Sequence, residues 1–269
     1  MHAYAVHSSL AKMWRRRPVK KLQAAREAFE LGNYNEAKIL IDSIKMLYPK
    51  AFETRRAGIG LMQEVELKEQ EKSLVYLDSM LQAKQKDFDA IKGNTLLKRC
   101  RIPEYRQLPS SFPSVEKNLH RSFLRFQVDE NGVMSMTSIY CGAHNIHHVA
   151  VKVTAPDGSF AETPAAKDSY ETTDLGEKIE KADFKLGEDG NVMGFLYLNK
   201  DKNIKVNYQG ERPYSITMTA ADRQALASVY ELAQLLSSMT EIKKNMEEAN
   251  LKIEFVKKKM EERKDNAQE

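Results

Sequence analysis

The C-terminal part of the sequence carries an apolar residue at every third or fourth position over four heptads, from Leu232 to Met260. Apolar residues at this spacing form one stripe along a helix, and a stripe of this length has to be buried against another helix. We therefore expect residues 219–269 to form a long coiled-coil helix that begins with a capping box at Thr219. Its expected core positions include Leu235, Met239, Ile242, Met246, Ile253 and Val256.

A second long helix is predicted over residues 51–92, which are rich in good helix formers and contain no proline. Its expected core positions include Leu74, Leu77, Leu81 and Phe88. The two helices have similar lengths, so the simplest solution pairs them antiparallel within one chain, as a stalk. A parallel homodimer through the C-terminal helix is the alternative, because Met and Ala at core positions do not select an oligomeric state. We expect a monomer in preference to a homodimer.

Residues 18–50 predict a helical hairpin that precedes the long helix. Its first helix starts at Pro18, Gly32-Asn33 forms the turn, and Pro49 stops the second helix. Residues 22–50 resemble a single tetratricopeptide repeat, through the small pair Ala24-Ala25 and the run from Gly32 to Ala37. Such repeats normally need neighbours, so we expect the hairpin to pack on the next helix. Residues 1–17 show no clear period, and we expect them to be disordered, loosely helical or poorly specified.

Between the long helices, residues 121–218 predict an antiparallel β-domain. Short apolar or alternating runs are separated by the turn pairs Asn131-Gly132, Asp157-Gly158 and Asp189-Gly190, which favour tight hairpins. Six short strands with no helix between them predict a sandwich or a small barrel. The expected strands are 122–128, 133–140, 147–154, 192–198, 204–208 and 214–218.

The predicted architecture is therefore α+β. An N-terminal hairpin and two long helices, 18–92 and 219–269, form an antiparallel coiled-coil stalk in which the C-terminal helix packs on residues 51–92. A β-sandwich-like domain is inserted between them. Residues 93–120 are rich in proline and basic side chains, and they predict an irregular linker.

Charge and composition narrow the class of function. The net charge is only +4 in 269 residues, and no basic stripe is interleaved with aromatic side chains, so nucleic acid is not an expected partner. The sequence contains no run of about 18 apolar residues, so no transmembrane segment is expected. The sequence as written shows no export signal, which favours the cytoplasm by default. The two cysteines, Cys100 and Cys141, have no CxxC spacing, and we expect them to be free thiols.

One short motif could carry chemistry. Cys141, His144 and His147 follow each other with C-x2-H-x2-H spacing, and thiolate and imidazole are zinc ligands. If a strand begins at His147, its side chain and that of His148 point to opposite faces. A polar loop is therefore the simpler interpretation, and we expect no cofactor. No nucleophile motif and no glycine-rich phosphate loop occur in the sequence, so we do not expect an enzyme.

From residue 22 onward the chain resembles an uncharacterised Bacteroides-type family with a helical hairpin, a long helix, a β-domain and a terminal coiled-coil helix. Members of that family are often lipoprotein-like, which would imply the cell envelope, although residues 1–20 of this chain hold no cysteine. The residues that carry the resemblance are 34–38, 41–44, 48–49, 66–71, 128–132, 158–164 and 230–232.

Two functions are consistent with these observations. The first is a non-catalytic interaction or scaffold protein that binds a protein or cell-envelope partner. The second is a small-ligand-binding or metal-binding β module, with Cys141, His144 and His147 as the candidate ligands.

Overall fold

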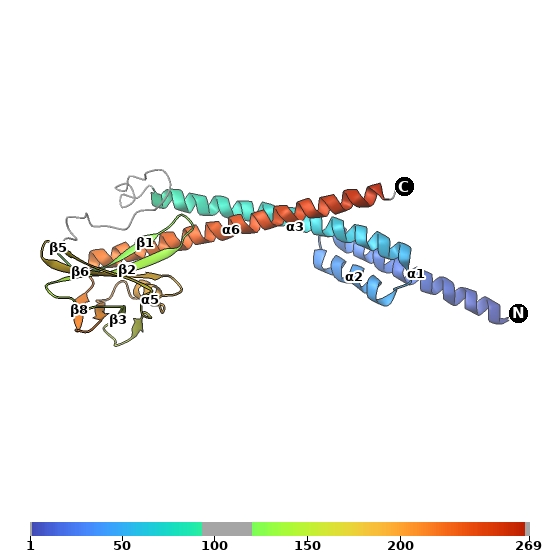
Figure 1. Cartoon of the computed structure of the whole chain (residues 1–269). Helices are drawn as coiled ribbons and strands as arrows, with labels where there is room; N and C mark the ends of the chain where they lie inside the picture. Colours follow the sequence, from blue (N-terminus) through green and yellow to red (C-terminus); the bar gives the residue numbers. More distant parts are fainter. Residues whose placement is uncertain (1, 93–119, 267–269) are drawn as a thin grey trace. The chain divides into compact units, whose positions relative to one another are not determined.

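The computed structural model describes residues 2–92 and 120–266 and shows an α+β protein (Figure 1). The chain divides into two compact units. The helical unit comprises residues 1–81 and 242–269, and the β unit comprises residues 82–241. The linker expected at 93–120 lies outside the described residues, except for His120.

The helical unit begins with α1 (His2–Glu30), α2 (Tyr34–Leu47) and the first part of α3 (Phe52–Lys92). Helices α1 and α2 form the predicted hairpin, and α3 packs on it through a common core. Most core positions on α1 and α2 are alanines, whose small side chains allow two helices to approach closely. The fully or almost fully buried members are Ala25, Ala28, Ala37, Ile41, Leu61 and Val65.

Helix α1 starts earlier than the sequence suggested. It runs from His2 through Pro18 to Glu30, whereas the regular helix was expected to start at Pro18, after a disordered or loosely helical segment. An interior proline removes one helical hydrogen bond but does not forbid a helix on its N-terminal side. Pro18 itself is buried.

The last helix, α6 (Ala220–Asp265), begins one residue after Thr219, whose hydroxyl accepts a hydrogen bond from the Asp222 amide at 3.1 Å. Within the helical unit, its C-terminal part runs antiparallel to α3 (Figure 1). Arg263 donates from Nη1 to the Gln63 side-chain oxygen at 3.2 Å. The expected core positions on α6 are buried, namely Leu235, Met239, Ile242, Ile253 and Val256, whereas Met246 is half-buried. The expected core positions on α3 are all half-buried, namely Leu74, Leu77, Leu81 and Phe88.

The β unit contains two four-stranded antiparallel sheets. Sheet A has the order β1-β2-β6-β5, and sheet B has the order β4-β3-β7-β8. The strands of sheet A are β1 (Phe123–Val128), β2 (Met134–Gly142), β5 (Asp168–Asp174) and β6 (Glu177–Lys185). Those of sheet B are β3 (Ala150–Thr154), β4 (Phe160–Glu162), β7 (Lys205–Gln209) and β8 (Tyr214–Thr217).

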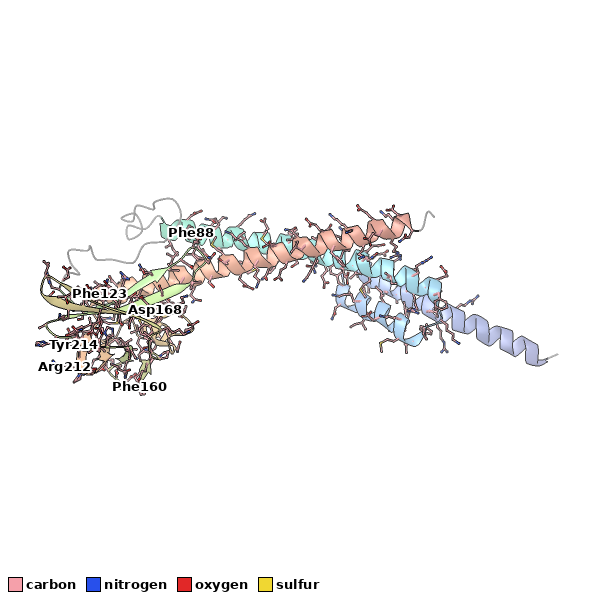
Figure 2. The ribbon with its side chains drawn as sticks, in the orientation of Figure 1. Phe88, Phe123, Phe160, Asp168, Arg212 and Tyr214 are labelled. Carbon is pink, nitrogen blue, oxygen red and sulfur yellow. The ribbon has the colours of Figure 1, made fainter. Side chains whose placement is uncertain are left out.

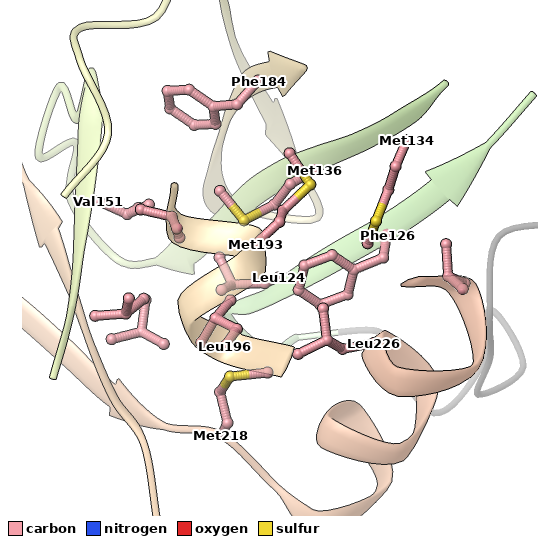
Figure 3. Close-up of a cluster of buried hydrophobic side chains, with 14 of the residues drawn as sticks. Leu124, Phe126, Met134, Met136, Val151, Phe184, Met193, Leu196, Met218 and Leu226 are labelled. Atoms are coloured by element: carbon pink, nitrogen blue, oxygen red, sulfur yellow. The ribbon is translucent and has the colours of Figure 1, made fainter. Parts of the chain in front are cut away.

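The core of the β unit draws on both sheets, on α5 (Val192–Leu198) and on the first part of α6 (Figure 3). Phe126 of β1, Leu196 of α5 and Leu226 of α6 meet in its centre (Figure 3). Phe88, near the end of α3, packs against the same cluster (Figure 2).

Two parts of the strand prediction were wrong. Residues 192–198 form a helix, not a strand. An apolar run this short does not distinguish a helix from a strand by its spacing, so the sequence pattern was ambiguous here. The buried Asp189 carboxylate accepts a hydrogen bond from the Met193 amide at 2.7 Å, which holds the first turn. Strands β4, β5 and β6 were not predicted, because β5 is mostly exposed and polar and β6 carries a glutamate on its buried face.

Candidate functional site

The most distinctive polar cluster of the β unit surrounds Glu180, on the inner face of β6. Its carboxylate is 2% exposed and accepts four hydrogen bonds from the β2–β3 loop. Oε1 accepts from the amides of Ile146 at 2.7 Å and His147 at 2.9 Å. Oε2 accepts from the amide and from Nδ1 of His148, both at 2.9 Å. A carboxylate offers about four lone-pair positions, so Glu180 is saturated and holds the loop in one conformation.

Burial by itself would raise the pKa of the Glu180 carboxyl. The hydrogen bonds from His148, His147 and Ile146 outweigh that effect and hold this pKa below its usual value. The carboxylate is therefore ionised at neutral pH, deep inside the domain. It forms a buried pair with His148, whose ring is also enclosed.

Ser138 of β2 completes a Ser-His-Glu arrangement. Its Oγ lies 2.9 Å from Nε2 of His148, whose Nδ1 contacts Glu180. The distances match those of a hydrolase triad, but Ser138 is 0% exposed. Its hydroxyl also lies 3.3 Å from the Ala182 carbonyl oxygen, within the sheet. A nucleophile must reach its substrate, so we interpret this arrangement as a structural network.

A second set of contacts ties the β2–β3 loop to sheet B. The Tyr208 ring packs edge-on against the His148 ring, with 5.2 Å between the ring centroids. The Glu211 amide donates to the Ile146 carbonyl oxygen at 2.7 Å. A Cβ on Gly210 would lie 2.1 Å from that same oxygen, so only glycine fits at position 210. The loop is thus held between sheet A and sheet B.

The outer side of the loop carries a second polar group. His147 is exposed, and its Nδ1 lies 2.7 Å from Oε1 of Glu171 on β5. The Asn145 side-chain amide donates to the other oxygen of Glu171 at 3.0 Å. The hydrogen bond to Glu171 and nearby negative charge raise the pKa of His147. The ligand atoms of His147, Glu171 and Glu180 lie within 4.8 Å of one another.

The structure separates the three residues that the sequence grouped as metal ligands. The Cys141 thiol donates to Glu177 Oε2 at 3.2 Å, and burial together with Glu177 raises its pKa to about 11. The His144 ring is exposed, and its carbonyl oxygen accepts a hydrogen bond from Tyr140 at 2.7 Å. His147 instead meets Glu171. Sequence reasoning missed Glu171 because strand β5 was not predicted.

His147 and His148 do lie on opposite sides of the loop, one exposed and one buried. The reason differs from the expected strand alternation, because β3 begins only at Ala150. His147 has a positive φ of 51°, which turns the backbone between the two side chains.

The helical unit has a separate surface feature, an apolar groove of about 690 Å³ where α2 passes into α3. Two large side chains at the groove are strongly exposed, Leu47 at 58% and Phe52 at 70%. Residues 45–56 also carry four basic side chains and one acidic side chain. The lining consists of Pro18, Leu47, Tyr48, Pro49, Lys50, Ala51, Phe52, Glu53 and Thr54.

Comparisons of the chain with protein-family models, with curated proteins and with solved structures found no match. None of the helices within residues 2–92 and 120–266 is long and apolar enough to cross a membrane.

Proposed function

We propose that this chain is a non-catalytic interaction protein whose helical unit binds a protein partner. The observation that carries this proposal is the apolar groove at the α2–α3 connection, where Leu47 and Phe52 expose most of their side chains. Large exposed apolar side chains that border a groove are typical of partner sites. A groove between helices suits the apolar face of an amphipathic helix.

Charge around the groove indicates the chemistry of the partner. Residues 45–56, which supply most of the lining, include the basic residues Lys45, Lys50, Arg55 and Arg56 and a single acidic residue, Glu53. A partner helix with an apolar face flanked by acidic residues would match both properties. The hairpin and α3 share one buried core, so the groove walls are held in place before a partner binds.

A selection of displayed helical peptides on the purified full-length protein tests the proposal. We expect the enriched peptides to be amphipathic and acidic. Replacement of Leu47 and Phe52 by serine should weaken their binding at least tenfold, because it removes apolar contact area without changing charge.

The matched control is Leu31→Ser. Leu31 is 78% exposed in the same unit but lies at the other end of the hairpin, away from the groove. This variant should bind the peptides as the unmodified protein does. Enriched peptides that bind the Leu47→Ser/Phe52→Ser variant equally well, or a selection that enriches no peptide, would contradict the proposal.

A further inference from the structure

The β2–β3 loop and strand β5 bring together nitrogen and oxygen atoms from three side chains, of which His147 and Glu171 are exposed and Asn145 is half-buried. These atoms are His147 Nδ1, the two carboxylate oxygens of Glu171 and the side-chain amide of Asn145. They come from two segments that are distant in sequence, the loop and strand β5. Imidazole nitrogen combined with carboxylate and amide oxygen is a ligand set for divalent cations such as Zn²⁺.

The Asn145 amide gives an independent indication of a ligand. Its nitrogen donates to Glu171, but its Oδ1 atom is buried and has no hydrogen-bond partner among the described residues. Buried acceptors in proteins are nearly always paired. The Asn145 amide contacts Glu171, which is also the partner of His147, so Oδ1 is an acceptor without a described partner on a side chain of the same group.

Glu180 has a different part in this arrangement. Its oxygens lie within 4.8 Å of the His147 and Glu171 ligand atoms, but they already accept four hydrogen bonds. It therefore offers no free lone pair. Its charge adds to that of Glu171 and of Glu211, which also acts on His147. Through the backbone amides of residues 146–148, Glu180 also fixes the position of the loop.

We propose that the β2–β3 loop binds a divalent cation of the zinc class, with His147 Nδ1, the Glu171 carboxylate and Asn145 Oδ1 as protein ligands. The cation takes the place of the direct contact between His147 and Glu171 and gives the orphan oxygen a partner. Water supplies the remaining coordination positions, because His147 and Glu171 face solvent. This site is independent of the groove in the helical unit.

Calorimetric titration with ZnCl₂ tests the proposal on the full chain after treatment with a chelator. Both cysteines are first replaced by serine, so that thiols do not bind the metal. We expect one Zn²⁺ per chain. His147→Ala and Glu171→Gln should each weaken binding at least tenfold, whereas Asn145→Asp should preserve or strengthen it because a carboxylate oxygen replaces the amide oxygen.

The matched control is His144→Ala, which removes an exposed histidine of the same loop that lies outside the cluster. It should leave the affinity unchanged. Circular dichroism melts without metal establish that each variant is folded. Absence of Zn²⁺ binding in the parent protein, affinity that survives His147→Ala, or equal loss in His144→Ala would overturn the proposal.

Discussion

Gly132, in the β1–β2 turn, lies directly against the backbone of α6. A Cβ at Gly132 would lie 2.2 Å from the amide nitrogen of Ser237 and 2.7 Å from the Ala233 carbonyl oxygen. Helix α6 therefore packs on the turn at a distance that only glycine permits. Gly132 also has φ +84°, a conformation that other residues rarely adopt.

We expect Gly132→Ala to destabilise the β unit by about 3 kcal/mol, from backbone strain together with the displacement of α6. Gly158→Ala is the matched control, because Gly158 has nearly the same φ of +85° and open space around its Cα. Gly158→Ala should lower the free energy of unfolding by about 1 kcal/mol, because it introduces backbone strain but no steric contact. Urea unfolding followed by circular dichroism measures both changes. Equal losses for the two variants would show that contact with α6 contributes nothing.

The buried Glu180 carboxylate should be essential to the β2–β3 loop. We expect Glu180→Ala to lower the free energy of unfolding by about 3–5 kcal/mol, since it leaves three amides and the His148 ring buried without their acceptor. In hydrogen exchange, the amides of residues 146–148 should lose protection. Glu188→Gln, which removes an exposed partner of Lys167, should leave stability unchanged within error. Protected amides in Glu180→Ala would contradict the assignment.

The pair of Arg121 and Asp222 predicts a loss of stability in acid. Both guanidinium nitrogens contact the two Asp222 oxygens, at 2.9 Å and 2.7 Å. Burial alone would raise the pKa of Asp222, but the hydrogen bonds from Arg121 and Thr219 outweigh it and lower this pKa from its ordinary value of 3.8. A carboxyl group whose pKa is lower in the folded than in the unfolded protein stabilises the fold at any pH above its unfolded-state pKa. This stabilisation is lost as the pH falls through the pKa of the group in the folded protein.

Asp222→Asn should therefore be less stable than the unmodified protein at pH 7 by about 1–3 kcal/mol. The difference should shrink below about pH 4, where the unfolded chain takes up the proton. Urea unfolding of both proteins at pH 7, 5 and 3 measures it, and the comparison cancels the titration of other carboxyls. A difference that is constant with pH would rule out the ion pair as its source.

The Cys141 thiol should react slowly at neutral pH. Its pKa is raised to about 11, so little reactive thiolate is present near pH 8. In a Cys100→Ser background, we expect modification by a disulfide reagent to accelerate strongly between pH 8 and pH 10. Glu177→Gln should increase the rate at pH 8, because the carboxylate beside the thiol disfavours its ionisation. A rate independent of pH over this range would contradict the raised pKa.

The antiparallel contact of α3 and α6 within the helical unit predicts a monomer. Light scattering coupled to size exclusion should give a mass near 30.8 kDa over a range of concentrations. A stable dimer would mean that the heptad stripe on α6 is used between chains.

Helices α2, α3 and α6 and the end of α1 could be predicted from the sequence because their signals are local. The heptad spacing defined α6, Pro49 separated α2 from α3, and Gly32 ended α1 with its positive φ of 77°. Each of these signals involves residues within one or two helical turns, where backbone preference and apolar spacing act directly. The β1–β2 hairpin at Asn131-Gly132 was predictable for the same reason.

The candidate metal ligands could be predicted only in part. His147 was singled out from its neighbours in sequence, but Glu171 and Glu180 were not, because the pattern of β5 and β6 gives little sign of a strand. In β6, the inner-face positions are Glu180, Ala182 and Phe184, and a glutamate at the first of them breaks the apolar alternation that marks a strand.

What the sequence determined by itself is the hairpin followed by a long helix, the long C-terminal helix with its heptad positions, and the antiparallel β character of the middle of the chain. What only the tertiary structure decided is how buried charge is accommodated. Glu180 can occupy the inner face of β6 because residues 146–148, more than 30 positions earlier, supply all four of its hydrogen-bond donors. Burial of a carboxylate is favourable only with such partners, and partners that distant in sequence leave no local pattern.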